Sequence, residues 1–182
     1  MLNKNTIDSF EDLYKRGYDK TYLNIELVRL ELLFLEKNKN KTLDFGAGHG
    51  ANGIHLLKKG HKVTFCDISK YALKTIRKKV PKKYKKKIKY LHLQNIKQLN
   101  KKIYRESFDN IICLSTINNF NSLKKFKKIF SIFNKILKSN GKLIIDTNLK
   151  KNNYKVIKRI NNTTILTSVN EKSNLKLKMC FP

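Results

Sequence analysis

The chain has few acidic residues, little arginine and no tryptophan. Its 182 residues contain 41 Lys plus Arg against 13 Asp plus Glu, which gives a formal net charge of +28. Such a charge is typical of proteins that bind nucleic acids or anionic membranes. However, 36 of the basic residues are Lys and 5 are Arg, and the planar guanidinium is the preferred donor to phosphates and bases. We therefore interpret the basic surface as compositional, in line with the 21 Asn and 19 Ile, and keep RNA as an alternative partner.

Long apolar runs and cysteine pairs are also lacking. No stretch approaches the ~20 apolar residues that cross a bilayer, and the first residues lead into polar sequence without the apolar core of a signal peptide. Cys66, Cys113 and Cys180 fit neither a disulfide framework nor a paired-thiolate zinc site, and the four histidines have no ligand spacing. We expect a cytoplasmic protein without a membrane segment or a metal, whose cysteines are reduced and mostly buried.

Short apolar segments alternate with helical patterns along the first 146 residues. The periodicity predicts helices over 22–36, 51–59, 69–79 and 122–138, and strands over 41–45, 61–67, 87–93, 108–115 and 142–146. Ser69 is the expected N-cap of the third helix, and the lysine run 82–89 is interpreted as a solvated connector. Five strands with such connections predict an α/β fold, a doubly wound, mostly parallel sheet with helices on both faces. Its ligand should lie at the carboxyl ends of the strands.

Four of the seven glycines lie within eight residues, directly after a predicted strand and before a predicted helix. They are Gly46, Gly48, Gly50 and Gly53. Glycine permits positive φ and close approach of the backbone, and the following helix presents free N–H groups, so the cluster predicts a loop that binds a nucleotide-like ligand. The spacing from Gly48 to Gly53 also matches the dinucleotide fingerprint, with Asp67 near the place of its ribose acid. The glycines alone therefore leave a nicotinamide cofactor open.

The stretch Thr42-Leu-Asp-Phe-Gly-Ala-Gly-His-Gly50 resembles the first motif of the class I S-adenosylmethionine-dependent methyltransferases. The resemblance extends from about Tyr14 to Asp146 and implies a Rossmann-like fold, S-adenosyl-L-methionine as cofactor and methyl transfer. Asp44 favours this interpretation over a nicotinamide cofactor. A carboxylate two residues before the first glycine is awkward beside a pyrophosphate but well placed for an ammonium group.

The resemblance also implies a set of cofactor-binding residues. Asp44 would serve the methionyl end, Asp67 would accept both ribose hydroxyls, and Ile68 would lie beside the adenine. Asn95 stands where the family often has an acidic residue near the adenine, although a loop-stabilising asparagine is the alternative. The full set is Asp44, Phe45, Gly46, Ala47, Gly48, Gly50, Asp67, Ile68, Asn95, Ile96 and Leu114.

In similar enzymes a tyrosine-rich N-terminal segment folds over the cofactor, and the segment after the fourth strand faces the transferred methyl group. The substrate or lid candidates are Tyr14, Tyr18, His49, Ser115 and Asn118, with Tyr22 in the same N-terminal segment. Ser115 and Asn118 have an alternative role as caps of the helix near Ser122. Arg16 is a candidate partner for the methionine carboxylate. No catalytic residue is identified, because an activated sulfonium needs mainly correct placement against a nucleophile.

We expect a single methyltransferase domain over residues 1–182. It would comprise a helical lid over 1–40, a cofactor-binding core over 41–147 and a β-hairpin extension over 148–182, with strands over 154–160 and 163–169 and a further segment over 174–180. The family sheet ordinarily ends in an antiparallel pair. The hairpin is either that C-terminal pair or an insertion that covers the substrate and leaves the sheet truncated.

The expected function is methyl transfer to a small-molecule acceptor. Three alternatives stay open: an RNA methyltransferase, an NAD(P)-binding oxidoreductase, and an inactive remnant that binds the cofactor without turnover. Nothing in the sequence names the acceptor, because a fold does not fix it.

Overall fold

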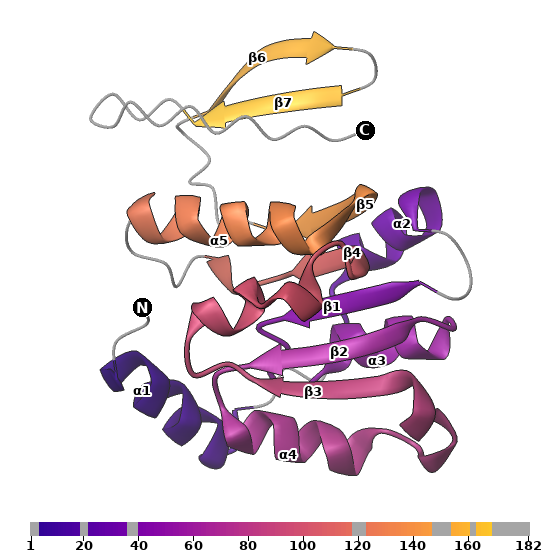
Figure 1. The fold of residues 1–182 in the computed structure, drawn as a ribbon, viewed down its shortest axis with the longest axis vertical. Helices are drawn as coiled ribbons and strands as arrows, with labels where there is room; N and C mark the ends of the chain where they lie inside the picture. Colours follow the sequence, from indigo (N-terminus) through magenta and orange to yellow (C-terminus); the bar gives the residue numbers. More distant parts are fainter. Residues whose placement is uncertain are drawn as a thin grey trace. The chain divides into compact units, whose positions relative to one another are not determined.

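The computed structural model describes residues 4–18, 22–35, 40–117, 123–146, 154–160 and 163–168. The chain divides into two compact units, residues 1–146 and 147–182. In the first unit five parallel strands form one sheet in the order β3-β2-β1-β4-β5 (Figure 1). The strands are β1 (Lys41–Phe45), β2 (Lys62–Asp67), β3 (Ile88–His92), β4 (Phe108–Cys113) and β5 (Leu137–Ile145). The strand order reverses between β1 and β4, which is where such sheets bind their ligands.

Helices and short 3₁₀ turns connect these strands. The helices are α1 (Lys4–Lys15), α2 (Ile25–Phe34), α3 (Ala51–Lys58), α4 (Lys70–Lys79) and α5 (Leu123–Ile136), and the 3₁₀ turns are η1 (Lys82–Lys87), η2 (Ile96–Asn100) and η3 (Lys102–Tyr104). Ser69 caps α4 as predicted, because its hydroxyl accepts the N–H of Ala72 at 3.0 Å. The lysine run forms η1 and buries none of its residues.

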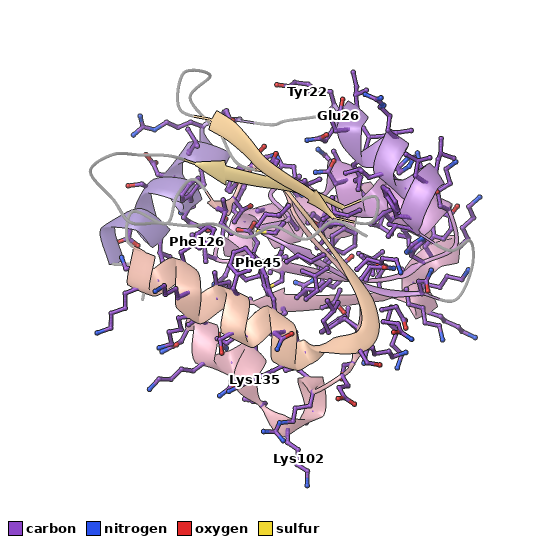
Figure 2. All side chains as sticks on the ribbon, turned by 90° about the horizontal axis from the view of Figure 1, so that it is seen from above. Tyr22, Glu26, Phe45, Lys102, Phe126 and Lys135 are labelled. Atoms are coloured by element: carbon purple, nitrogen blue, oxygen red, sulfur yellow. The ribbon has the colours of Figure 1, made fainter. Side chains whose placement is uncertain are left out.

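Two apolar clusters, one on each face of the sheet, form the core. Successive strand residues point to opposite faces, so Ile111 joins the cluster under α5 while Ile112 joins the cluster formed with α2, α3 and α4. Phe45 packs edge-on against Phe133 of α5, with ring centroids 5.1 Å apart. Figure 2 shows Phe45 inside the molecule, whereas the side chain of Lys102 extends outward. The predicted doubly wound α/β fold is therefore confirmed.

The largest difference from a predicted element boundary is at the start of β5. The helix predicted over 122–138 ends at Ile136, and β5 begins directly at Leu137 rather than at Lys142. Leu137 pairs with Phe108 of β4, and the register shifts before Asn110 pairs with Lys142. The intervening residues of β5 are exposed and polar, so hydrophobicity gave no signal that a strand had begun.

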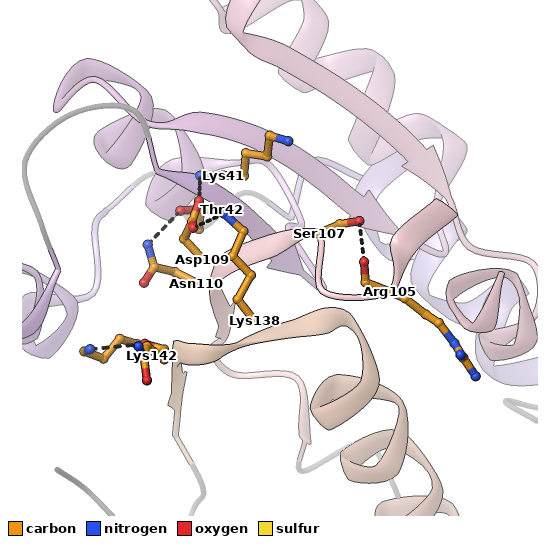
Figure 3. Close-up of polar contacts among 9 residues, drawn as sticks. Lys41, Thr42, Arg105, Ser107, Asp109, Asn110, Lys138 and Lys142 are labelled. Carbon is orange, nitrogen blue, oxygen red and sulfur yellow. Dashed lines mark hydrogen bonds and ion pairs between the residues drawn. The ribbon is translucent and has the colours of Figure 1, made fainter. Parts of the chain in front are cut away.

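A carboxylate ties three strands together at the amino-terminal edge of the sheet. Asp109 of β4 accepts the N–H of Lys41 at 2.7 Å and the ammonium of Lys138 at 2.6 Å (Figure 3). Partial burial acts to raise the pKa of Asp109, but the hydrogen bonds from Lys138 and Lys41 outweigh it and hold the pKa below its usual value. Beside it, Asn110 donates to the Thr42 hydroxyl at 3.4 Å.

The second unit contains an antiparallel pair, β6 (Tyr154–Ile160) and β7 (Thr163–Ser168), as the hairpin pattern predicted. The two strands form a sheet of their own, and the five-stranded sheet is parallel throughout. The expectation of antiparallel C-terminal strands at the end of the main sheet is therefore wrong for the strands that the structure describes. The third predicted segment, 174–180, lies outside the described residues.

Two further findings concern sequence expectations. Cys66 and Cys113 are buried free thiols, and Cys180 lies outside the described residues. Within the parts of the chain that the structure describes, every helix is too short or too polar to cross a membrane.

Candidate functional site

The glycine-rich turn after β1 is fastened to the end of β2. The N–H groups of Gly46 and Ala47 both donate to the carbonyl of Cys66, at 2.8 and 3.0 Å. The turn closes with a 2.8 Å hydrogen bond from Gly50 N–H to the Ala47 carbonyl. Gly46, Gly48 and Gly50 have φ angles of +74°, +52° and +84°, which residues with a Cβ rarely adopt. The turn thus directs backbone N–H groups and the start of α3 toward the carboxyl edge of the sheet.

These glycines also allow close packing within the protein. A Cβ at Gly46 would collide with the side chain of Thr116, and one at Gly50 would lie 2.8 Å from Ile76. The glycine cluster therefore reflects two demands: the φ angles of the turn, and the close approach of neighbouring side chains to it. The sequence analysis recognised the first demand only, because the second depends on tertiary contacts.

Asp67, the last residue of β2, holds two backbone segments together. Its Oδ2 accepts the N–H of Gly48 at 2.7 Å, and its Oδ1 accepts the N–H of Ser69 at 2.8 Å. The side chain is 5% exposed. Burial raises the pKa of Asp67, while the hydrogen bonds from Ser69 and Gly48 act in the opposite direction. The carboxylate fixes the position of the glycine turn relative to the start of α4.

Asp44 lies in β1 beneath the same turn. It is not among the residues that line the cavity at the carboxyl ends of the strands, which is described below. Burial raises its pKa to about 7; the N–H of Gly53 opposes this shift, and the charge of Asp67 adds to it. Its Oδ2 has no hydrogen-bond partner among the residues that the structure describes. A buried carboxylate oxygen without a donor favours a cationic group nearby, which would both neutralise and satisfy it.

Helix α1, near the N-terminus of the chain, packs against the glycine turn. The ring of Tyr14 packs on His49 with centroids 4.8 Å apart, and a Cβ on Gly48 would lie 3.1 Å from the Tyr14 hydroxyl. Burial and the nearby charge of Asp67 raise the pKa of Tyr14. Glu11 attaches the helix to the core, because its carboxylate accepts the Ser69 hydroxyl at 2.5 Å. In Figure 1, α1 lies beside α4 accordingly.

The segment after β4 forms the opposite wall. Ser115 has a φ of +53°, an uncommon conformation for a residue other than glycine. Asp146, directly after β5, holds it there by accepting the Ser115 N–H at 2.5 Å and its hydroxyl at 3.4 Å. The Thr116 hydroxyl donates to the Leu114 carbonyl at 3.0 Å. A strained residue held by a specific carboxylate is typical of a functional wall, and the sequence analysis did not single out Asp146.

These parts enclose a cavity of about 210 Å³ at the carboxyl ends of the strands. From the predicted cofactor set it brings together Phe45, Gly46, Ala47, Gly48, Gly50, Asp67, Ile68 and Leu114. From the lid and substrate set it brings together Tyr14, Tyr18, His49 and Ser115. Sequence reasoning missed Phe10, Asn24, Ala51, Asn52, Leu93 and Thr116. Leu93 follows β3 and Thr116 follows Ser115, so the rule that ligands lie at strand ends would have found both.

Other predicted residues are placed elsewhere. Asn95 accepts the N–H of Lys97 and its own N–H donates to Gln98, both at 2.9 Å, which is a reciprocal cap of η2. This is the loop-stabilising role, and neither Asn95 nor Ile96 is among the residues that line the cavity. Ile96 packs against the core cluster under α5. Asn118 lies outside the described residues.

Arg16 does not reach the cavity. It pairs with Asp12 at 2.6 Å, with 78% of its side chain exposed. The described residues contain no group of three or more His, Cys, Asp and Glu side chains that could hold a metal ion.

Comparison with known proteins agrees with this geometry. Residues 43–143, which span β1 to β5, match the family model described as a methyltransferase domain. The chain belongs to this methyltransferase family. The resemblance drawn from the motif at Asp44 is thereby confirmed, and the nicotinamide alternative is set aside.

Individual relatives of this methyltransferase domain have diverse substrates. The chain is 30% identical over 141 residues to a protein named histidine protein methyltransferase 1 homolog from Dictyostelium discoideum, covering 74% of this chain and 44% of that protein. It therefore spans less than half the length of this curated relative.

Solved structures share the fold at low identity. A TehB-like S-adenosylmethionine-dependent methyltransferase from Corynebacterium glutamicum matches with a TM-score of 0.53 and 20% identity, over 78% of this chain and 70% of that one. The 1,6-didemethyltoxoflavin-N1-methyltransferase of Burkholderia thailandensis, described with bound S-adenosylhomocysteine, matches with a TM-score of 0.65 and 13% identity, over 91% and 65%.

S-adenosylmethionine is the cofactor that these comparisons indicate, and the residues present fit it. The cofactor carries an ammonium group, and Asp44, which is 3% exposed and lies beneath the glycine turn rather than in the cavity wall, places an acidic group close to that turn. The cavity is lined by the backbone of Gly46 and Gly48 and reaches Asp67 and Ile68 at the end of β2. These are the positions expected for the methionyl, ribosyl and adenine parts of this cofactor.

Proposed function

We propose that the protein transfers the methyl group of S-adenosylmethionine to a small-molecule acceptor. The observation that carries this proposal is the closure of the cavity by α1. With Tyr14 packed on His49 and against Gly48, the volume of about 210 Å³ is below the roughly 300–1,000 Å³ of common ligand pockets. A cavity of this size beside α1 accommodates a small acceptor with less displacement of α1 than a large one.

Each wall has a separate role in this proposal. Asp67 holds the glycine turn and would receive the ribose, and Asp44, beneath the turn and outside the cavity wall, would favour the ammonium of the cofactor through its charge. Ser115, fixed by Asp146, would border the acceptor. The cofactor, when bound, supplies a methyl group activated by its sulfonium. The side chains of α1 would exclude water and hold the acceptor in line, which supplies much of the acceleration in such transfers.

The division of the chain follows from these roles. Residues 1–40 would act as the lid and 41–147 as the cofactor-binding core of one methyltransferase domain. Residues 148–182 would be a hairpin extension of that domain. The contacts of Glu11 and Tyr14 support the first assignment, and the match over 43–143 supports the second.

A protein side chain is the second candidate acceptor. The relative from Dictyostelium discoideum is named a histidine protein methyltransferase, and it matches 74% of this chain. RNA remains a third candidate, favoured by the net charge of +28 alone. These acceptors are compared directly by supplying labelled cofactor with low-mass metabolites, with proteins or with RNA, and measuring which fraction gains the label.

Calorimetric titration tests the cofactor first. We expect S-adenosylmethionine and S-adenosylhomocysteine to bind with micromolar affinity and NADH not to bind. Asp67→Ala should weaken binding at least about tenfold, or about 1.4 kcal/mol, because both segments that the carboxylate joins are released. Asp109→Ala is the matched control, since it also removes a carboxylate that accepts a backbone N–H at 2.7 Å, but at the opposite edge of the sheet. Binding of NADH in preference, or equal losses in the two variants, would contradict the proposal.

A further inference from the structure

The cavity differs in charge from the rest of the molecule. Of the 182 residues 41 are Lys or Arg, so a random set of nineteen lining residues would contain about four. Among the nineteen lining residues that the structure describes there is neither a Lys nor an Arg. Cationic side chains are therefore absent from the described wall of the cavity, as they are from the buried core. The charged side chain that does line it, Asp67, is acidic.

Aromatic rings take the place of cationic groups at the N-terminal wall. Phe10, Tyr14 and Tyr18 form a run of neighbouring rings with centroids 6.2 to 6.3 Å apart. Tyr22, which also lines the cavity, is 74% exposed, and Figure 2 shows it at the outside of the molecule. The faces of such rings attract cations and repel anions.

The aromatic N-terminal wall of the cavity would bind an anionic acceptor poorly. An acceptor phosphate or carboxylate that enters beside α1 loses water and needs a cationic partner, but no described lining residue is a Lys or Arg, and the lining histidine, His49, is covered by Tyr14. A neutral or cationic group would bind more favourably, because the aromatic rings and the carboxylate of Asp67 lie in the cavity wall. The acceptor end that enters the cavity is therefore not anionic.

The acceptor wall distinguishes nitrogen from oxygen. A hydroxyl of ordinary pKa must lose its proton during attack and needs a base beside it. Both oxygens of Asp67 accept backbone N–H groups, and the hydroxyls of Ser115 and Thr116 donate to Asp146 and to the Leu114 carbonyl. None of these groups is placed to take a proton, and the histidine among the described lining residues, His49, is covered by the ring of Tyr14 and is 7% exposed. A neutral nitrogen, such as that of an imidazole or of the unprotonated fraction of an amine, attacks with its own lone pair and needs no base for that step.

We infer that the acceptor is an amine or imidazole nitrogen of a small molecule, an inference that rests on the proposed function. In the reaction the nitrogen lone pair forms the bond to the methyl carbon. The carbon–sulfur bond breaks with its electron pair left on sulfur, so the sulfonium becomes a neutral thioether. The methylated nitrogen carries the positive charge and then gives its extra proton to water. No oxidant or further reactant is required.

The experiment compares two probes of matched size and opposite charge. Protein saturated with S-adenosylhomocysteine, whose binding is measured first, is titrated with benzylamine and with benzoate. We expect benzylamine to bind at least about tenfold more tightly, which is about 1.4 kcal/mol. Equal affinities, no binding of either probe, or a preference for benzoate would overturn the inference. Failure of S-adenosylhomocysteine to bind would instead refute the proposed function.

Two tyrosine variants test whether the aromatic wall of the cavity causes the preference for benzylamine over benzoate. Tyr18→Ala removes a ring from the cavity wall, whereas Tyr71→Ala removes a tyrosine that is not a lining residue and has a similar exposure, 37% against 43%. Tyr18→Ala should reduce the preference for benzylamine at least threefold, and Tyr71→Ala should leave it unchanged. If the two variants behave alike, the wall does not select charge. An oxygen-methylated product in the labelled-cofactor assay would also refute the inference.

Discussion

Asp44 and Asp67 lie at the ends of neighbouring strands, yet they have different tasks. Asp67 uses both oxygens on backbone N–H groups, whereas Asp44 keeps one oxygen without a partner among the described residues. The sequence identified both acids, Asp44 by its place two residues before the first glycine of the cluster and Asp67 by its place at the end of the second strand. It did not show that Asp44 lies beneath the turn, since that depends on how α3 packs on β1.

The free energy of unfolding of the ligand-free protein should depend on the protonation state of Asp44. Its pKa is about 7 in the folded chain against 3.8 normally, so the folded state binds the proton more tightly than the unfolded state. This group therefore lowers stability progressively as pH rises from about 4 to 7, and its cost is complete above pH 7. Asp44→Asn removes the cost. We expect the gain in free energy of unfolding from this substitution to grow from pH 5 to pH 8 in urea denaturation.

An exposed acid provides the control for this measurement. Asp12→Asn removes a carboxylate that is 55% exposed on α1, and its effect should not grow with pH over the same interval. A gain from Asp44→Asn that is the same at pH 5 and pH 8 would show that Asp44 is not held in a raised-pKa state.

At the scale of elements, α1 is attached to the core by few polar contacts. Glu11 accepts the Ser69 hydroxyl at 2.5 Å and the N–H of Tyr71 at 3.3 Å, which are groups at the start of α4. A carboxylate at a helix N-terminus is also favoured by the helix dipole. Glu11 therefore decides how often the proposed lid leaves the glycine turn.

Removing this carboxylate should free α1 without unfolding the sheet. Hydrogen bonds to charged groups contribute about 1.5–3 kcal/mol, so Glu11→Ala should speed amide exchange in α1 by roughly tenfold or more. Exchange in β1 and β2 should not change. Asp12→Ala is the matched control, because Asp12 lies next to Glu11 but pairs with exposed Arg16. If both variants speed exchange in α1 equally, Glu11 has no special part in holding the helix.

Elements that bury an apolar face could be predicted from the sequence, and those fixed by polar contacts could not. The five strands and the helix pattern follow from hydrophobic periodicity, and the structure confirms them. The early start of β5 was missed because residues 138–141 are polar and lie where the register with β4 shifts, between the pairs made by Leu137 and Lys142. Asp146 was missed as part of the site for the same reason, since only the fold brings it to Ser115.

The lysine surface belongs to the whole molecule rather than to the site. Local ion pairs such as Lys138 with Asp109 neutralise a small part of it, because the chain has 28 more basic than acidic residues. Exposed lysines such as Lys102 of η3 and Lys135 of α5 lie at the outside of the molecule (Figure 2). Like charges spread over one small protein repel each other and oppose the compact state.

Salt should therefore stabilise this protein. The Debye length falls from about 30 Å at 0.01 M to about 8 Å at 0.15 M ionic strength, so added NaCl screens repulsion between separate elements. We expect a gain of about 1 kcal/mol between 10 and 300 mM NaCl, which raises the Tm by roughly 2–4 °C. Sorbitol at equal osmolality is the uncharged control and should give a smaller rise. A Tm that stays constant or falls with salt would mean that the lysines are already paired in the folded protein. That result would contradict the interpretation of the lysines as an unpaired, solvated surface.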